Sequence, residues 1–358
     1  MTILDIAYKR LYNQHIASRT LEKPDQVVEW MGAVQAQDYL GALWAVGLRT
    51  RDANEEDVKK AIADKTIVRT WPMRGTLHFV AAADVRWMLD LLTPRIIAGS
   101  EWRDKQLELN DRIFARSKEL FVSALEGGKQ LPRDAMYGLL EAAHISTTGG
   151  RGLHILSRLA QEGVICFGAR EGKQQTFALL DEWAPKARKL ARDEALAELA
   201  RRYFTSHGPA SLQDFAWWSG LKTADARAGL EMVKQHLVQE VSDGQTYWLD
   251  SSMPTPKDGS PTAYLLPAFD EYTVAYKDRS AVLNPSYTKQ VYAGNGIFYP
   301  AIVIDGQIVG TWKRTLKRSA VVITPSPFAR LNEAETRAFA VAASRYGEFL
   351  GQEEQLIY

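Results

Sequence analysis

One pattern of elements occurs three times along the 358-residue sequence, and it constrains the fold more than any other feature. Each copy predicts a helix, a short break, a second helix, and two short strands joined by a tight turn. The middle copy is the clearest. Leu131-Pro132 opens a helix that runs to about Ala142, because proline is tolerated in the first turn. A second helix spans about Arg151–Gln161, and Val164–Phe167 and Thr176–Leu180 form the hairpin. A helix–turn–helix followed by a hairpin is a winged helix.

The other two copies follow the same order with less regular sequences. In the third copy the elements are a helix from Ser211 through Trp218, a helix from Thr223 to about His236, and strands over Leu237–Val241 and Thr246–Leu249. In the first copy they are a helix over Pro24–Val34, a helix across Glu55–Lys65, and strands over Ile67–Trp71 and Thr76–Val80 that turn at Pro72-Met73-Arg74-Gly75. Three tandem winged helices are therefore expected.

The composition changes after Met253–Pro261, which is the best linker in the chain. Five segments beyond it read as strands, with Asp305-Gly306 as a strong hairpin turn. They are Ala263–Leu266, Thr273–Tyr276, Ile297–Ile304, Gln307–Thr311 and Ala320–Thr324, and a helix from about Asn332 to Leu350 closes the chain. We predict an α+β protein with winged helices over residues 1–82, 83–185 and 186–252, and a β-barrel-like domain over 261–358.

Composition limits the class of protein. With 46% hydrophobic and 24% charged residues, the chain is typical of globular proteins. No signal peptide and no membrane-spanning run of about 20 apolar residues is apparent, so a cytoplasmic location is expected. The single cysteine, Cys166, excludes an internal disulfide framework and a cysteine-rich zinc site. The net charge of +1 means that any DNA-binding surface must concentrate its positive charge on one face.

Gln35-Ala36-Gln37-Asp38 places two carboxamides one residue apart, straight after an amphipathic helix. On a helix the two side chains would diverge by about 200°, but on an extended backbone they point the same way. Gln35 and Gln37 can then converge on one water or ligand. The alternative is an ordinary polar helix exit. Asp38 would point away on a strand, for capping or for pairing with an arginine; if the backbone turns there, it supplies negative charge instead.

Three basic regions are candidates for DNA contact. On the helix Arg151–Gln161, Leu153, Leu156 and Ala160 predict one apolar face, and Arg151, His154 and Arg158 form the opposite one, which a recognition helix would present to DNA. In the first hairpin, Arg69, Met73, Arg74 and His78 combine apolar bulk with arginine, as groove-inserting wedges do. Lys313, Arg314, Lys317 and Arg318 form the densest basic run. Each region has a plainer reading as a solvated helix face, a soluble turn or an exposed loop.

Several catalytic motifs are missing from the sequence. It contains no HExxH, no P-loop, no glycine-rich dinucleotide fingerprint in a strand–turn–helix setting and no GxSxG. We therefore expect neither a metal nor a cofactor. Asp270, Glu271 and Asp278 are carboxylates in the C-terminal region, and we assign them to turns or ion pairs.

Four segments together carry a resemblance to a known family. They are Val34-Gln35-Ala36-Gln37, Met73-Arg74-Gly75-Thr76-Leu77-His78, Leu266–Tyr272 with Tyr276–Ser280, and Gly310-Thr311-Trp312. Over nearly its full length the chain resembles the AlkZ/YcaQ-like helix–turn–helix superfamily of bacterial DNA glycosylases, in the AlkZ-like branch. The resemblance implies three winged helices around a β-barrel, forming a C-shaped channel for double-stranded damaged DNA.

The resemblance also implies site residues and a substrate class. Gln35 and Gln37 match the catalytic Gln-x-Gln motif of the branch, and Asp38 and His78 are candidate supporting residues. The Arg74–His78 stretch matches the family hairpin that is expected to lie against the damaged groove. Family substrates are N-alkylated purines, especially N7-alkylguanine, including bulky adducts and interstrand crosslinks. A monomer that acts as a monofunctional glycosylase is expected.

Two other classes of function remain open from the sequence. A non-catalytic winged-helix DNA binder or transcriptional regulator would need a dimerisation helix to match a two-fold operator, and we find no heptad stretch for one. A winged-helix module that binds a small molecule or a protein would lack positive potential in its channel.

Overall fold

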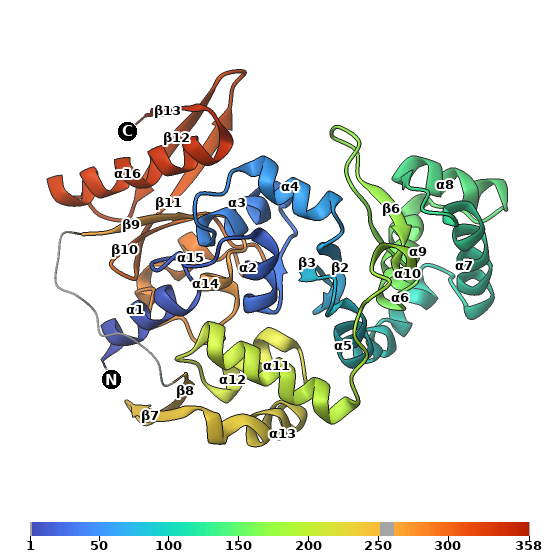
Figure 1. Cartoon of the computed structure of the whole chain (residues 1–358), viewed down its shortest axis with the longest axis horizontal. Coiled ribbons are helices and arrows are strands. Elements are labelled where there is room, and N and C mark those ends of the chain that lie inside the picture. The colour runs from blue at the N-terminus through green and yellow to red at the C-terminus, as the bar shows by residue number, and fades with distance from the viewer. Residues whose placement is uncertain (1, 251–260, 358) are drawn as a thin grey trace. The chain divides into compact units, whose positions relative to one another are not determined.

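The computed structural model describes residues 2–250 and 261–357 (Figure 1). The chain divides into two compact units. Unit 1 consists of Met1–Val58 and Leu196–Tyr358, and unit 2 consists of Lys59–Ala195. The predicted linker lies outside the described residues except for Pro261. The predicted domain boundaries and the three-winged-helix arrangement remain predictions, because this division groups residues only by compactness.

Unit 2 contains a mixed set of helices and short antiparallel strands around one apolar core. Its strands follow the order β3-β2-β5-β6-β4, and Phe121, Leu140 and Leu159 are among its fully buried core residues. The elements are β2 Ile67–Met73, β3 Thr76–Ala81, α5 Val85–Gly99, α6 Glu101–Gln106, α7 Asp111–Leu125, β4 Leu131–Pro132, α8 Arg133–Ala142, η1 Thr148–Gly150, α9 Arg151–Gln161, β5 Ile165–Phe167, β6 Thr176–Leu179 and α10 Leu180–Trp183. The predicted second helix and hairpin of the middle copy are confirmed.

The first hairpin turns later than the sequence predicted. Strand β2 continues through Met73, which pairs with Thr76, so the turn consists of Arg74 and Gly75 alone. Both residues have positive φ, +54° and +71°, which a two-residue type I′ hairpin turn requires. Pro72 and Met73 therefore belong to the strand.

The apolar face of α9 also differs from the prediction. Its buried side is formed by Ile155, Leu156, Leu159 and Ala160, whereas Leu153 is 52% exposed. This stripe follows the i, i+3, i+4 spacing of a core-facing helix, and Leu153 is one position out of phase with it.

Unit 1 holds helices from both ends of the chain. They are α1 Ile3–Asn13, α2 Pro24–Met31, α3 Tyr39–Arg49, α4 Glu55–Ala63, α11 Arg192–His207, α12 Leu212–Ser219, α13 Thr223–Val233 and η2 Lys234–His236, with β1 Val34–Gln35, β7 Val238–Ser242 and β8 Gln245–Leu249; α4 and α11 cross the unit boundaries. Helix α3 was not predicted. All but its first two residues are buried, so it shows no polar stripe from which periodicity could identify it.

The C-terminal part of unit 1 is a five-stranded sheet in the order β13-β12-β11-β10-β9 (Figure 1). Only β12 and β13 are parallel. This is a half-barrel-like sheet with edge strands β9 and β13. Its elements are β9 Ala263–Leu266, α14 Glu271–Val274, η3 Pro285–Tyr287, α15 Thr288–Val291, β10 Ala301–Ile304, β11 Gln307–Leu316, β12 Ala320–Pro327, α16 Glu333–Leu350 and β13 Glu353–Leu356.

Local chemistry accounts for two of these boundaries. Asp305 and Gly306 take positive φ of 47° and 84° between β10 and β11, which confirms the predicted turn. Asn332 caps α16 through a capping box with Glu335, which confirms the predicted helix.

The strand predicted over Thr273–Tyr276 is wrong, because α14 covers Glu271–Val274 and Asp270 caps it with its carboxylate. Among the described residues, none of the helices has the length and apolarity that a membrane span needs.

Candidate active site and nucleic-acid interface

The segment with the two glutamines leaves α2 at Gly32, which has a positive φ. Gly32 has φ +75° and a Cβ there would lie 3.5 Å from the Trp218 ring, so the chain turns closely over that indole. The backbone is extended at Val34–Gln35 and bends at Gln37 and Asp38 before α3 begins. Gln35 is 7% exposed, whereas Gln37 is exposed. The two side chains therefore differ in their access to solvent, and the convergence of their carboxamides stays a prediction.

A buried carboxylate holds the backbone of this segment. The Gln35 amide N–H donates to Glu271 Oε1 at 2.8 Å, and the Trp218 indole Nε1–H donates to Glu271 Oε2 at 3.0 Å. Glu271 is fully buried. The assignment of Glu271 to turns or ion pairs missed this hydrogen bond. The sequence did hold a signal for it: Asp270 and Glu271 stand in an apolar stretch that is expected to be buried. A buried charge requires hydrogen-bond partners, so such a pair predicts bonds to other elements.

Asp270 forms the ion pair that the sequence predicted for this carboxylate pair. Its Oδ1 and Oδ2 accept from Arg49 Nη2 and Nη1, each at 2.8 Å, and both side chains are buried. Arg49 Nη2 also donates to Gln14 Oε1 at 2.8 Å. This bidentate pair joins α3 to α14, the short helix that carries Glu271.

Asp38 pairs with an arginine, as predicted. Its Oδ2 accepts from Arg314 Nη2 at 3.2 Å, and Arg314 Nη1 donates to Tyr346 Oη at 2.9 Å. Asp38 also precedes the first residue of α3, Tyr39. The bend after Gln37 is therefore attached to strand β11 and helix α16. A chemical role for the Asp38 charge stays a prediction.

The basic run lies at the end of the β11–β12 hairpin. Lys313, Lys317 and Arg318 are exposed, whereas Arg314 is held by Asp38 and Tyr346. Lys317 closes the turn by donating its amide to Ala320 O at 2.8 Å. Three cations on one exposed hairpin form a surface suited to phosphate contact, and DNA binding by this run remains a prediction.

The first hairpin does not carry the exposed apolar wedge that the sequence suggested. Met73 and Trp71 are buried, and Trp71 packs against Phe167 at 5.0 Å between ring centroids. Arg69 is also buried, with its guanidinium carbon 4.7 Å from the centre of the Phe167 ring. Met73 is buried because β2 extends through it instead of turning before it.

His78 and Arg74 form a pair at the turn of this hairpin. His78 Nδ1 lies 3.0 Å from the carbonyl oxygen of Thr76, and His78 Nε2 lies 3.2 Å from Arg74 Nη2. An arginine has no acceptor, so Nε2 accepts from Arg74 and the ring proton is on Nδ1. The Arg74 guanidinium is thereby oriented at the tip of the hairpin.

The polar face of α9 is covered within unit 2 by α6. His154 Nε2 contacts Asp104 Oδ1, and Arg158 Nη1 contacts Asp104 Oδ2 at 3.3 Å. Arg151 donates to the carbonyl oxygens of Leu107 and Ser146. The prediction that this face lies open toward a groove is wrong, because Asp104 of α6 pairs with His154 and Arg158, and backbone carbonyl groups outside α6 accept from Arg151. DNA contact by Arg151, His154 and Arg158 stays a prediction.

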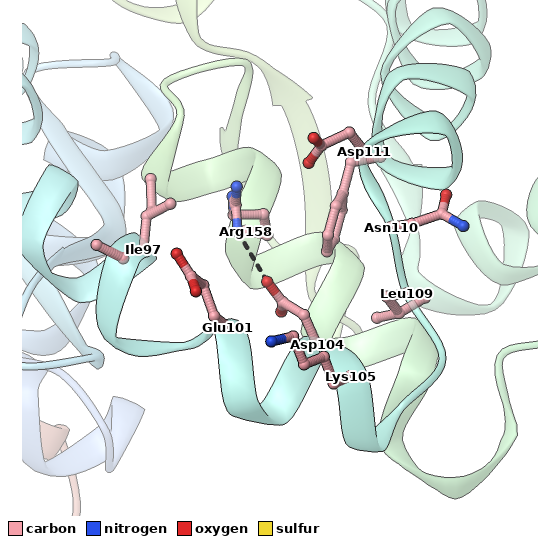
Figure 2. A pocket seen from close by; sticks show the side chains of 10 residues that line it. Ile97, Glu101, Asp104, Lys105, Leu109, Asn110, Asp111 and Arg158 are labelled. Carbon is pink, nitrogen blue, oxygen red and sulfur yellow. Dashed lines mark hydrogen bonds and ion pairs between the residues drawn. The ribbon is translucent and has the colours of Figure 1, made fainter.

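A cavity of about 400 Å³ adjoins this covered face (Figure 2). Figure 2 shows the Arg158 side chain directed at Asp104, with Glu101 and Asp111 also bordering the space. Its charged lining consists of the carboxylates Glu101, Asp104 and Asp111 and the cations Lys105 and Arg158. The excess of carboxylates disfavours a DNA phosphate at this position. Within residues 2–250 and 261–357, no cluster of three His, Cys, Asp or Glu is arranged to hold a metal.

Comparison with known proteins gives consistent matches. The family model described as DNA glycosylase AlkZ-like matches residues 28–349. An interstrand DNA cross-link repair glycosylase of Streptomyces sahachiroi is 27% identical over 339 residues, covering 89% of each chain. The solved structure of Streptomyces sahachiroi DNA glycosylase AlkZ aligns over all of both chains with a TM-score of 0.82 and 22% identity. That structure has the fold of this chain.

Proposed function

The chain belongs to the AlkZ-like family of DNA glycosylases, and we propose that it hydrolyses the N-glycosidic bond of cationic alkylated purines, with N7-alkylguanine as the substrate class. We include guanines tied into interstrand crosslinks, because the relative from Streptomyces sahachiroi is named for crosslink repair. Gln35 and Gln37 are the proposed catalytic residues. The observation that carries this assignment is an exposed Gln37 beside a Gln35 whose backbone is fixed by a buried carboxylate.

Two carboxamides suit this substrate. Alkylation at N7 places a positive charge on the purine, so the base leaves readily and no strong acid is needed. Departure of the base leaves an oxocarbenium-like sugar, as in glycoside cleavage. The carboxamide oxygens of Gln35 and Gln37 would orient a water and stabilise that charge through their dipoles. A carboxamide is no real general base, so the enzyme should act only on lesions that are already labile and cationic.

DNA contact is proposed for the two basic hairpins. Lys313, Lys317 and Arg318 present exposed charge on the β11–β12 hairpin, and Arg74 lies at the tip of the first hairpin with its guanidinium oriented by His78. Glycosylases that flip a base out of the stack need a closed pocket, which a crosslinked base cannot enter freely. A channel that leaves the base stacked avoids that requirement. The regulator considered from the sequence is disfavoured, because the family is one of enzymes.

The proposed function is tested by base release from defined DNA. The protein should release 7-methylguanine from methylated duplex DNA and leave uracil in the same sequence untouched, because uracil is a neutral leaving group. The measurement is release of free base, resolved by chromatography under single-turnover conditions. Comparable rates on the two lesions would rule out a mechanism that depends on a cationic leaving group.

The salt dependence of DNA binding should show whether the β11–β12 hairpin or helix α9 contacts DNA phosphates. Lys317→Ala combined with Arg318→Ala should weaken DNA binding irrespective of sequence, and the slope of log K against log salt should fall by about one unit for each phosphate that is no longer neutralised. The same measurement on Arg151→Ala and Arg158→Ala tests whether α9 contacts the DNA phosphate backbone. Arg116→Ala, which removes an exposed arginine paired with Glu119, serves as a reference. An unchanged slope in the hairpin double variant would remove β11–β12 from the interface.

A further inference from the structure

We propose that Glu271 is a positioning residue of this enzyme: its buried carboxylate fixes the backbone of the Gln35–Gln37 segment through the hydrogen bond to the Gln35 amide. The inference rests on the proposed role of the two glutamines and adds a residue that contributes no atom to the chemistry. It begins from the Gln35 amide, whose hydrogen bond to Glu271 Oε1 is 2.8 Å long and joins residues 236 positions apart.

The Glu271 carboxylate links three elements of unit 1. One oxygen accepts from Gln35 in β1, the other accepts from the Trp218 indole in α12, and the residue itself belongs to α14. A Cβ added at Gly32, where the chain turns toward Gln35, would be 3.5 Å from the same indole. The short path from Gly32 to Gln35 therefore passes beside Trp218 and is held by Glu271 at the Gln35 amide.

Helix α14 is anchored firmly enough to act as a base for this hydrogen bond. Asp270 is locked to Arg49 by the bidentate pair, and the Tyr272 hydroxyl lies 2.8 Å from Gly306 O and 3.1 Å from Ala7 O. Phe269 takes a positive φ of 61° just before these residues. A bulky side chain rarely adopts this conformation, and it persists only where the surroundings impose it.

The tautomer of His207 determines which substitutions can replace the carboxylate. Ser206 Oγ donates to Arg202 O at 2.7 Å, so it accepts from His207 Nδ1–H, also at 2.7 Å. His207 Nε2 then carries a lone pair, 3.7 Å from Glu271 Oε2. Burial lowers the pKa of His207, while the Glu271 carboxylate acts in the opposite direction. A carboxamide at position 271 could accept from Gln35 and direct its NH₂ group toward this lone pair, but the Trp218 indole N–H would then lose its acceptor.

The consequence for catalysis is geometric. The orientation of the Gln35 and Gln37 side chains depends on the backbone of the segment, and this backbone bends directly after the hydrogen bond to Glu271. A misplacement of about 1 Å at a reacting group can cost roughly 100-fold in rate. Removal of the Glu271 acceptor should therefore slow the reaction without removing any group that touches DNA.

The test compares Glu271→Met, which has no strong acceptor, with Glu271→Gln, which keeps one for the Gln35 amide. Glu271→Met should lower the single-turnover rate of 7-methylguanine release roughly 10- to 100-fold, with the Kd for DNA changed less than about threefold. Glu271→Gln should lose less of the rate than Glu271→Met, because it keeps the acceptor for Gln35 and loses only the one for the Trp218 indole. Hydrogen exchange of the Gln35 amide is followed in protein labelled with 15N-glutamine, where its signal disappears in Gln35→Ala. Exchange should accelerate in Glu271→Met and stay slow in Glu271→Gln.

A buried carboxylate of unit 2 supplies the matched control. Asp84→Asn changes a similarly buried side chain that pairs with Arg188 and accepts from the Trp87 indole, so it should lower stability while the rate per folded molecule stays at the wild-type value. Full activity in Glu271→Met, or unchanged exchange of the Gln35 amide, would overturn the proposal. So would a Glu271→Gln variant as slow as Glu271→Met, since that result would assign the effect to the charge or to the Trp218 hydrogen bond instead of the Gln35 hydrogen bond. If Gln35→Ala and Gln37→Ala are themselves fully active, the proposed catalytic role fails, and the exchange data still decide whether the hydrogen bond exists.

Discussion

Gln37→Ala should lower the rate of 7-methylguanine release on the order of 100-fold or more while leaving DNA affinity almost unchanged. The reason is that the carboxamide acts on the transition state, where positive charge develops on the sugar, and removal of one such preorganised dipole costs about that factor in other enzymes. A contact made only in the transition state lowers turnover instead of binding. Single-turnover base release and fluorescence anisotropy with uncleaved DNA measure the two quantities separately.

Gln37→Asp is the most informative companion variant. It converts the motif to Gln-x-Asp, the form that the resemblance implies for the YcaQ-like branch of the superfamily, so it should retain part of the activity that Gln37→Ala removes. The Gln35→Ala/Gln37→Ala double variant should be close to inactive. Full activity in that double variant would show that the glutamines are not the catalytic groups.

Arg49→Met should destabilise unit 1 by about 3–5 kcal/mol, because it leaves the Asp270 carboxylate buried without its cation. Arg49 and Asp270 are both fully buried and share two hydrogen bonds of 2.8 Å. Urea unfolding followed by circular dichroism and tryptophan fluorescence gives the change in free energy of unfolding. Trp44, Trp218 and Trp312 are buried in unit 1 and report on its core.

An exposed ion pair in the same unit provides the reference. Lys234→Met breaks the surface pair with Glu231, where both side chains are about half exposed, and should change stability by less than about 1 kcal/mol. Arg49→Met combined with Asp270→Leu removes both buried charges and should recover part of the stability, since a buried pair is often replaceable by apolar residues. Equal destabilisation by Arg49→Met and Lys234→Met would contradict the structural role given to the buried pair.

Local chemistry was sufficient to predict several elements and the candidate motif. The Asp305-Gly306 turn, helix α9 and the capping of α16 follow from residues within one or two turns of each other in sequence. The Gln35-Ala36-Gln37 motif was likewise visible, because its spacing is a local property of the chain. In each case the residues that specify the feature are neighbours, so the sequence reports the interaction directly.

Other features depended on packing that no local pattern records. Helix α3 is buried on nearly every side, so it lacks the polar stripe that marks a helix. The polar face of α9 matched a DNA-reading helix, and only the fold revealed that Asp104 of α6 and the Leu107 carbonyl group pair with its side chains. Burial of Met73 followed from the extension of β2, which is set by pairing with β3.

The sequence by itself determined which residue types are present for the chemistry: two carboxamides one residue apart, a basic hairpin, and a pair of carboxylates in an apolar segment. The tertiary structure alone decided which carboxylate supports the glutamines and which supports the core. Glu271 reaches Gln35 and Asp270 reaches Arg49, although the two carboxylates are adjacent. Both partners lie more than 200 residues away in the sequence, so each pairing depends on how distant elements pack together. That packing is set by the free energy of the whole core, in which each buried charge must find a partner, and no local spacing of residues specifies the pairing.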